Sequence, residues 1–154
     1  MNSISDTDIE IFYLMHQRRL RSAETRVLRH ILITLNDDFA DNRRPQVEDR
    51  LGAIRSRLLQ APQNFAAAAL KYSECPTALN GGLLGTVPRG QLYPELERMA
   101  FGLQAGELSV VVESPMGLHL LRCDAINASR EISLAEASPF IRRQLEQSRR
   151  RQAA

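Results

Sequence analysis

Two histidines and one cysteine are the side chains of this sequence best suited to chemistry. His30 lies in an apolar run, Cys75 lies in a turn-rich stretch, and His119 lies in a second apolar run. A histidine beside a thiol can lower the thiol pKa and make it a nucleophile. Taken alone, a strand histidine is more often a satisfied core residue, and a lone cysteine is more often a small buried apolar residue. The elements that hold these side chains therefore decide between the two interpretations.

His30 and Cys75 are predicted to lie on different kinds of element. Residues 27–35 are dense in Val, Ile and Leu and predict a strand. Strand alternation places four of its side chains on one face: Leu28, His30, Leu32 and Thr34. Residues 73–85 hold Cys75 among prolines and glycines, which predicts a loop with a short helical turn.

His119 is predicted to lie on the second strand of an antiparallel hairpin, which residues 108–113 and 118–126 form around a turn at 114–117. Helical periodicity is found in the other segments, at residues 5–17, 47–58, 65–72 and 94–102 and from residue 133 onward. This order of helix, strand, helices, two strands and helix favours the α+β class, with a small antiparallel or mixed sheet. These patterns alone predict a soluble α+β domain and no particular function.

Composition narrows the class of protein. The chain has 154 residues, enough for one domain with helical extensions. A net charge of +2 and an aromatic share of 5% argue against nucleic-acid binding. The sequence has neither an apolar run of about 18 residues nor a basic and apolar leader, so we expect a cytoplasmic protein without a membrane partner. The dispersed cysteines and histidines predict free thiols and no metal site.

Six short strings, in one order along the chain, resemble the parvulin family of peptidyl-prolyl cis-trans isomerases. They are RHIL at 29–32, YSEC at 72–75, GGLLG at 81–85, RGQL at 89–92, GELS at 106–109 and GLH at 117–119. Any one of them is common in unrelated proteins, whereas six in the family's order are not. The resemblance covers about residues 27 to 126.

The resemblance implies a parvulin-like fold of the FKBP-like superfold, with a four-stranded antiparallel or mixed sheet surrounded by helices. The isomerase domain would span residues 27–126. Residues 1–26 would be an N-terminal helical extension, and residues 127–154 would be a C-terminal helix with a basic tail. The implied activity is prolyl isomerisation in a proline-containing polypeptide client, and it needs no cofactor.

By the same resemblance, His30, Cys75, Ser114 and His119 form a polar catalytic cluster. The proline pocket beside it would be lined by Leu84, Leu92, Leu96, Phe101 and Met116. The two histidines would fix the geometry of the cluster, and Cys75 would lie nearest the substrate carbonyl. Because the reaction breaks no bond, an electrostatic and desolvating role for Cys75 is preferred over covalent attack.

Several positions depart from the family pattern. Many parvulins have Met at the position of Leu92 and Phe at the position of Leu96, so the pocket is expected to lose an aromatic wall. The alternative function is then a non-catalytic chaperone that holds prolyl-containing unfolded segments. Arg43 and Arg44 stand where phosphate-directed parvulins carry basic residues. Nearby aspartates oppose phosphate binding, and a solvated loop of mixed charge is the alternative interpretation.

Partners follow from the resemblance as well. Within the parvulins, the chain is similar to a maturation factor of nitrogenase, which implies the nitrogenase iron protein as a client. The helices predicted at residues 5–17 and 133–150 could also serve self-association or docking of a partner.

Overall fold

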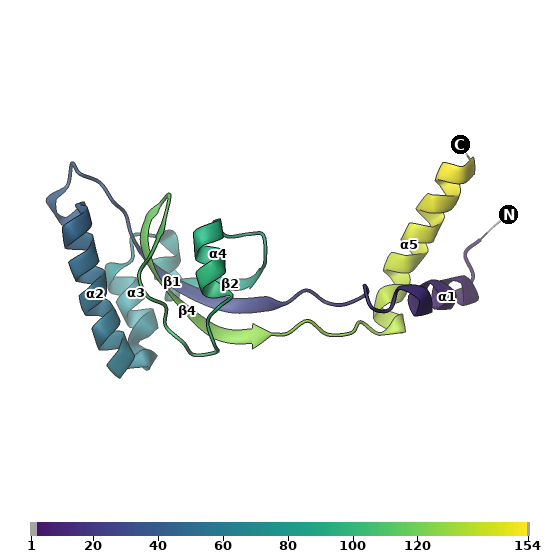
Figure 1. The fold of residues 1–154 in the computed structure, drawn as a ribbon, viewed down its shortest axis with the longest axis horizontal. Helices are drawn as coiled ribbons and strands as arrows, with labels where there is room; N and C mark the ends of the chain where they lie inside the picture. The colour runs from purple at the N-terminus through teal and green to yellow at the C-terminus, as the bar shows by residue number, and fades with distance from the viewer. Residues whose placement is uncertain (1–2, 154) are drawn as a thin grey trace. The chain divides into compact units, whose positions relative to one another are not determined.

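The computed structural model describes residues 3–153, which form two units (Figure 1). One unit is Glu24–Asn127, and the other combines the described parts of Met1–Ala23 and Ala128–Ala154. The larger unit contains, in chain order, β1 (Thr25–Ile33), α2 (Arg44–Gln60), α3 (Phe65–Tyr72), β2 (Leu83–Pro88), α4 (Pro94–Ala100), β3 (Val112–Ser114) and β4 (Gly117–Asn127). The smaller unit contains α1 (Asp6–His16) and α5 (Leu134–Ala153).

The larger unit is built on a four-stranded sheet with the strand order β2-β1-β4-β3, and every neighbouring pair is antiparallel. The predicted α+β class with a four-stranded sheet is therefore confirmed, in its antiparallel form. In the β1–β4 register, Leu32 lies opposite His119 and His30 lies opposite Leu121. Residues directly opposite in an antiparallel pair share a face, so both histidines lie on the same side of the sheet.

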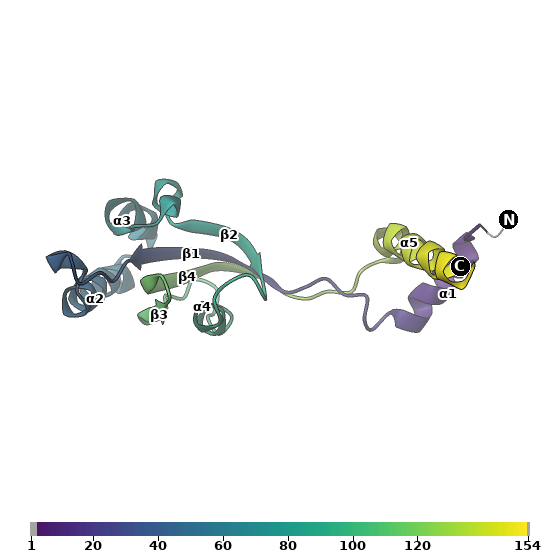
Figure 2. The same cartoon turned by 90° about the horizontal axis from the view of Figure 1, so that it is seen from above.

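Each face of the sheet has its own core. The face without the histidines presents Ile31, Ile33, Leu118 and Leu120, which pack against buried residues of α2 and α3. The histidine face presents Leu28, Leu121 and Cys123, which pack against α4. Figure 2 shows the four strands in the order β2, β1, β4 and β3, with α3 near the β2 edge and α4 near β4 and β3. The helical periodicity found at residues 47–58 corresponds to the buried residues of α2, which are Val47, Leu51, Ile54 and Leu58.

Strand β2 was not predicted from the pattern of the sequence, which indicated a loop as far as Gly85. Its residues do not alternate between buried and exposed, because an edge strand pairs with one neighbouring strand and is only partly buried. The glycines before it have left-handed backbones, with φ of +64° at Gly81 and +78° at Gly82. A Cβ on Gly82 would lie 2.3 Å from the His30 carbonyl oxygen. This close approach brings the chain alongside β1, where the His30 N–H donates to the Gly82 carbonyl at 2.9 Å.

The predicted strand at 108–113 is also corrected, because β3 covers only Val112–Ser114. Leu108 makes an isolated bridge with Arg122. In the segment between Leu108 and β3, the Leu121 N–H donates to the Ser109 hydroxyl at 2.9 Å, where a regular ladder would use a backbone carbonyl. The strand is interrupted because a side-chain hydroxyl takes the place of the backbone acceptor. The hydrophobic periodicity of the sequence does not reveal such a hydrogen bond.

The smaller unit pairs α1 with α5. Ser5 caps α1 through a reciprocal capping box with Asp8, and Ser133 and Glu136 form the same motif at the start of α5. Ile9 packs with Ile141 in a small apolar cluster. Residues 1–2 and 154 of the predicted extensions lie outside the described residues. Between residues 3 and 153, no helix combines the length and the apolar character needed to cross a membrane.

Candidate functional site

A cavity of about 480 Å³ lies on the histidine face of the sheet, beside α4. Its lining contains three of the four predicted cluster residues, His30, Cys75 and His119. It also contains four of the five predicted pocket residues: Leu84, Leu92, Leu96 and Met116. Three strands, two loops, the start of α4 and the β3–β4 turn therefore converge on one apolar space that has polar groups at its floor. This cavity is called the proline cavity below.

The polar floor is a chain of four hydrogen-bonded side chains. The Nδ1 atoms of His30 and His119 are 3.1 Å apart, and the rings stack with centroids 5.3 Å apart. The outer nitrogens are also occupied, because His119 Nε2 lies 2.6 Å from Ser114 Oγ and His30 Nε2 lies 3.0 Å from Thr77 Oγ1. A neutral imidazole has one donor and one acceptor nitrogen. The chain therefore runs in one direction, from Ser114 to Thr77 or the reverse.

Both histidines are neutral at physiological pH. Burial lowers the pKa of His30 from 6.5 to about 4. Burial also lowers the pKa of His119 to about 4, and the neighbouring charge of a protonated His30 contributes. The side chains leave only 4% and 0% of their surfaces exposed. The pair therefore acts as a fixed set of dipoles and not as a source of positive charge.

Cys75 is held at the cavity by the segment before it, which hydrogen-bonds along β1. The Glu74 N–H donates to the Leu32 carbonyl at 2.7 Å, and the Leu32 N–H donates to the Ser73 hydroxyl at 3.1 Å. The Glu74 carboxylate accepts hydrogen bonds from the N–H and the hydroxyl of Thr34, both at 2.8 Å. Among the described residues, the Cys75 thiol makes no hydrogen bond to a histidine. The base contact that activates a nucleophilic thiol is thus lacking, which favours a non-covalent role.

Ser114 and Met116 are placed by the tight turn between β3 and β4. The Met116 N–H donates to Ser114 Oγ at 3.1 Å, so this hydroxyl serves both the turn and His119. Gly117 has a φ of +147°, and a Cβ there would lie 2.5 Å from the Ile33 carbonyl oxygen. The turn can therefore close against β1 only with glycine at this position, and it leaves Met116 partly exposed at the rim of the cavity.

Phe101, the fifth predicted pocket residue, is not part of the cavity lining. It is buried in the same apolar cluster as Leu96, on the histidine face of the sheet. The guanidinium groups of Arg26 and Arg89 lie 5.2 and 4.5 Å from its ring centroid. Phe101 therefore packs against residues of the cavity wall and does not line the cavity itself.

Arg43 and Arg44, the predicted phosphate ligands, both have protein partners. Arg44 forms a two-point ion pair with Glu113, at 2.5 and 3.2 Å, and this contact raises the pKa of the guanidinium. Arg43 donates to the Asp37 carbonyl at 3.2 Å. A phosphate at this loop would have to compete with a carboxylate that already satisfies Arg44.

Sequence reasoning missed Thr77, Gln91 and Tyr93. Thr77 ends the hydrogen-bond chain, but a threonine in a turn-rich segment carries no signal of that role. Gln91 and Tyr93 line the cavity on either side of Leu92. Tyr93 supplies an aromatic ring to a pocket that was expected to have lost one.

Comparisons with known proteins find relatives among peptidyl-prolyl isomerases. A family model described as Rotamase, PPIC-type PPIASE domain, matches residues 30–125. The chain is 43% identical over 148 residues to NifM of Azotobacter vinelandii, which is named a peptidyl-prolyl cis-trans isomerase. That match covers 96% of this chain and 50% of the relative, so the chain spans about half the length of the curated relatives it matches.

Solved structures share the fold. A crystal structure of a PpiC-type peptidyl-prolyl cis-trans isomerase domain superposes with a TM-score of 0.62 at 29% identity, covering 70% of this chain and 95% of that domain. A SurA-like chaperone of Campylobacter jejuni superposes with a TM-score of 0.70 at 18% identity. That second match covers 98% of this chain and 58% of the chaperone and shows a shared fold.

Proposed function

Because this chain belongs to the PPIC-type, or parvulin, family of peptidyl-prolyl cis-trans isomerases, we propose that it catalyses rotation about prolyl bonds in a polypeptide client. The uncatalysed rotation faces a barrier of about 20 kcal/mol, because resonance holds the peptide bond planar. An isomerase must favour the twisted state, in which that resonance is broken and the nitrogen is no longer planar.

The proline cavity offers the surroundings that the twisted state requires. Its aliphatic lining from Leu84, Leu92 and Leu96 suits a pyrrolidine ring, and Met116 borders the opening. Desolvation of the prolyl carbonyl at Cys75 weakens the charge separation on which amide resonance depends. No bond to the protein forms or breaks in this mechanism.

The observation that carries the proposal is the neutral, fully hydrogen-bonded chain from Ser114 through both histidines to Thr77 beneath an apolar cavity. An ordinary apolar core at these positions would bring neither buried imidazoles nor an adjoining open cavity. The chain sets the polarity of the cavity floor without placing a charge there.

The test is prolyl exchange in a panel of short Xaa-Pro peptides, measured by NMR with the intact protein and with Cys75→Ala and His119→Ala. Faster exchange that both substitutions reduce supports the proposal. Binding without acceleration, seen as shift changes at Leu92 and Met116, would contradict catalysis.

That second outcome would support the other candidate function, a chaperone that holds prolyl segments without turning them over. The favouring observation is the aliphatic character of Leu92 and Leu96, which gives a softer wall than an aromatic ring. Under this alternative, suppression of client aggregation survives Cys75→Ala and His119→Ala. Under the isomerase proposal, the effect on client refolding depends on both residues.

The client that we propose is the nitrogenase iron protein, a choice that rests on the similarity to NifM. A nitrogenase client would place this protein in the cytoplasm. The test is refolding of the purified iron protein with and without this chain, followed by the activity of the iron protein. An unchanged rate and yield of refolding would contradict the assignment.

We also propose that the smaller unit mediates self-association. The outer face of α1 exposes Ile11, Leu14 and Met15, and α5 exposes Phe140. Single apolar residues on a surface are ordinary, whereas adjacent exposed apolar residues favour an interface. Light scattering on the wild-type chain and on Leu14→Asn with Met15→Gln tests this, and an equal monomeric mass for both would exclude it.

A further inference from the structure

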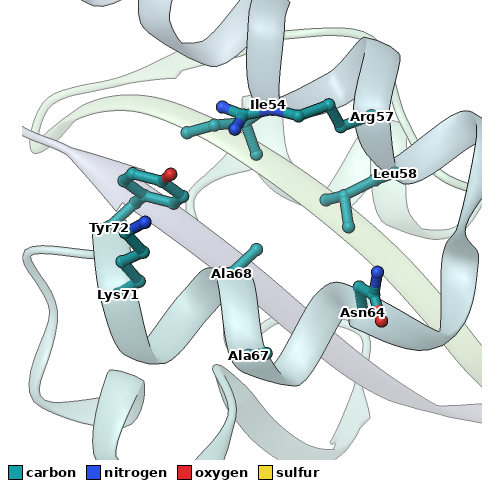
Figure 3. Close-up of a pocket in the computed structure, with 8 residues that line it drawn as sticks. All are labelled: Ile54, Arg57, Leu58, Asn64, Ala67, Ala68, Lys71 and Tyr72. Carbon is teal, nitrogen blue, oxygen red and sulfur yellow. The ribbon is translucent and has the colours of Figure 1, made fainter.

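A second groove lies between α2 and α3 and shares no residue with the proline cavity (Figure 3). These helices cover the sheet face opposite the histidines. The groove has a volume of about 390 Å³, which falls in the usual range for ligand pockets. Its lining is Ile54, Arg57, Leu58, Asn64, Ala67, Ala68, Lys71 and Tyr72.

The floor of this α2–α3 groove is aliphatic. Ile54 and Leu58 project from α2, and Ala68 faces them from α3 (Figure 3). Alanines at 67 and 68 keep the α3 wall low, so that space remains above the buried residues of α2. An aliphatic side chain can be accommodated there without displacing the core.

One end of the groove is strongly cationic. Arg57 and Lys71 lie over the Tyr72 ring, with the charged groups 5.6 and 5.2 Å from its centroid. Lys71 and then Arg57 lower the pKa of the Tyr72 hydroxyl below its ordinary value. None of the eight lining residues is acidic, and neither cation forms an ion pair within the described part of the chain. This end therefore lacks a negative partner.

The other end carries Asn64, which lies away from the two cations in Figure 3. Its side chain makes no hydrogen bond to any residue between 3 and 153, although its backbone N–H donates to the Ala61 carbonyl. A carboxamide offers donors and an acceptor together, as a peptide backbone requires. The groove thus presents a cationic end, an aliphatic middle and an amide end.

We infer that the α2–α3 groove binds a polypeptide segment in which an acidic side chain lies beside an aliphatic one. The carboxylate fits between Arg57 and Lys71, the aliphatic side chain lies on Leu58 and Ala68, and the Asn64 amide pairs with the backbone of the segment. The inference rests on the proposed function only in taking the ligand to be a polypeptide. Such a site holds a client at a point separate from the prolyl bond under rotation.

The probe is a capped, proline-free peptide of alternating Glu and Leu, titrated into the isotope-labelled full chain and followed by NMR. The expected result is saturable shifts at Ala67 and Ala68. A peptide with Gln in place of every Glu should bind about fivefold more weakly, as expected when exposed ion pairs are lost. Raising the salt concentration should remove the same preference.

Three substitutions and a matched control locate the site. Arg57→Gln and Lys71→Gln should each weaken binding of the acidic peptide about two- to fivefold. Arg98→Gln removes one positive charge from α4 and should leave the affinity unchanged. Ala68→Leu fills the aliphatic floor and should abolish binding. Circular dichroism confirms that each variant is folded.

Equal affinity for the Glu and Gln peptides would overturn the inference, as would a loss for Arg98→Gln equal to that for Lys71→Gln. Loss of binding with Cys75→Ala and His119→Ala would place the peptide in the proline cavity instead. Saturable binding of decanoate at Arg57 without binding of the peptide would make the groove a site for lipid anions. None of these results bears on prolyl exchange, so the proposed isomerase function stands or fails separately.

Discussion

Acidification should destabilise the larger unit through its two buried histidines. The pKa of each falls from 6.5 in the unfolded chain to about 4 in the folded one. Between these values the unfolded chain binds more protons than the folded chain does. The free energy of unfolding therefore rises with pH from about 4 to 6.5 and is lost as pH falls through the same window.

The size of this effect follows from the two pKa values. A fall of this size corresponds to about 3 kcal/mol for one histidine between pH 7 and pH 4, and about 6 kcal/mol is the upper limit for the pair. Small domains are stable by about 5–15 kcal/mol, so the loss is a large part of the total. Carboxylates that are hydrogen-bonded in the fold, such as Glu74, add a further acid-dependent loss.

A comparison with His119→Leu separates the histidines from the carboxylates. This variant removes one buried titrating group and keeps the carboxylates. Urea unfolding followed by circular dichroism from pH 4 to pH 7.5 should show a pH-dependent loss about 3 kcal/mol smaller in the variant than in the wild type. His16→Leu, in the smaller unit, is the matched control and should keep the wild-type slope for the larger unit. Equal slopes for His119→Leu and the wild type would refute the reasoning, as would stability that increases towards pH 4.

Three further predictions concern the backbone, the cavity and the loop before α2. Gly82→Ala should destabilise the larger unit by about 3 kcal/mol in urea unfolding, because the added Cβ meets the His30 carbonyl oxygen. Gly85→Ala is the control, because its Cβ meets open space, and it should cost only about 1 kcal/mol. Tyr93→Ala should weaken binding of a Phe-Pro peptide about threefold in an NMR titration, and unchanged affinity would show that the ring is not part of the pocket. A phosphoserine-proline peptide should bind the wild type no more than about twofold tighter than its unphosphorylated form in calorimetry, because Glu113 occupies Arg44. A strong phosphate preference that Arg44→Gln removes would contradict this assignment.

The parts of the fold that follow hydrophobic periodicity could be predicted from the sequence. The β1 strand lies where its apolar run indicates, and α2 and α4 each bury the face that their apolar spacing indicates. The parvulin family was identified correctly, and the fourth strand of the sheet came from that resemblance. Periodicity could not find β2, because an edge strand with a glycine at its third position has little alternation to detect.

The candidate site was predicted mainly by the resemblance and not by the spacing of its residues. His30 and His119 are 89 positions apart, and only the β1–β4 register brings their rings together. Thr77 and Tyr93 depend on turn geometry, which is decided by contacts with distant segments. Local sequence patterns carry little information about such long-range contacts.

The hydrogen-bond chain also joins two segments that border the proline cavity. Ser114 belongs to the turn that carries Met116, and Thr77 belongs to the short helical segment that follows Cys75. The two histidines connect these loops across β1 and β4, so the cavity walls are joined by hydrogen bonds through the floor. An apolar pair at the same positions would fill the floor but would not hold the loops at a set separation. A broken chain should therefore weaken the binding of proline peptides even where every residue that contacts the ring is retained.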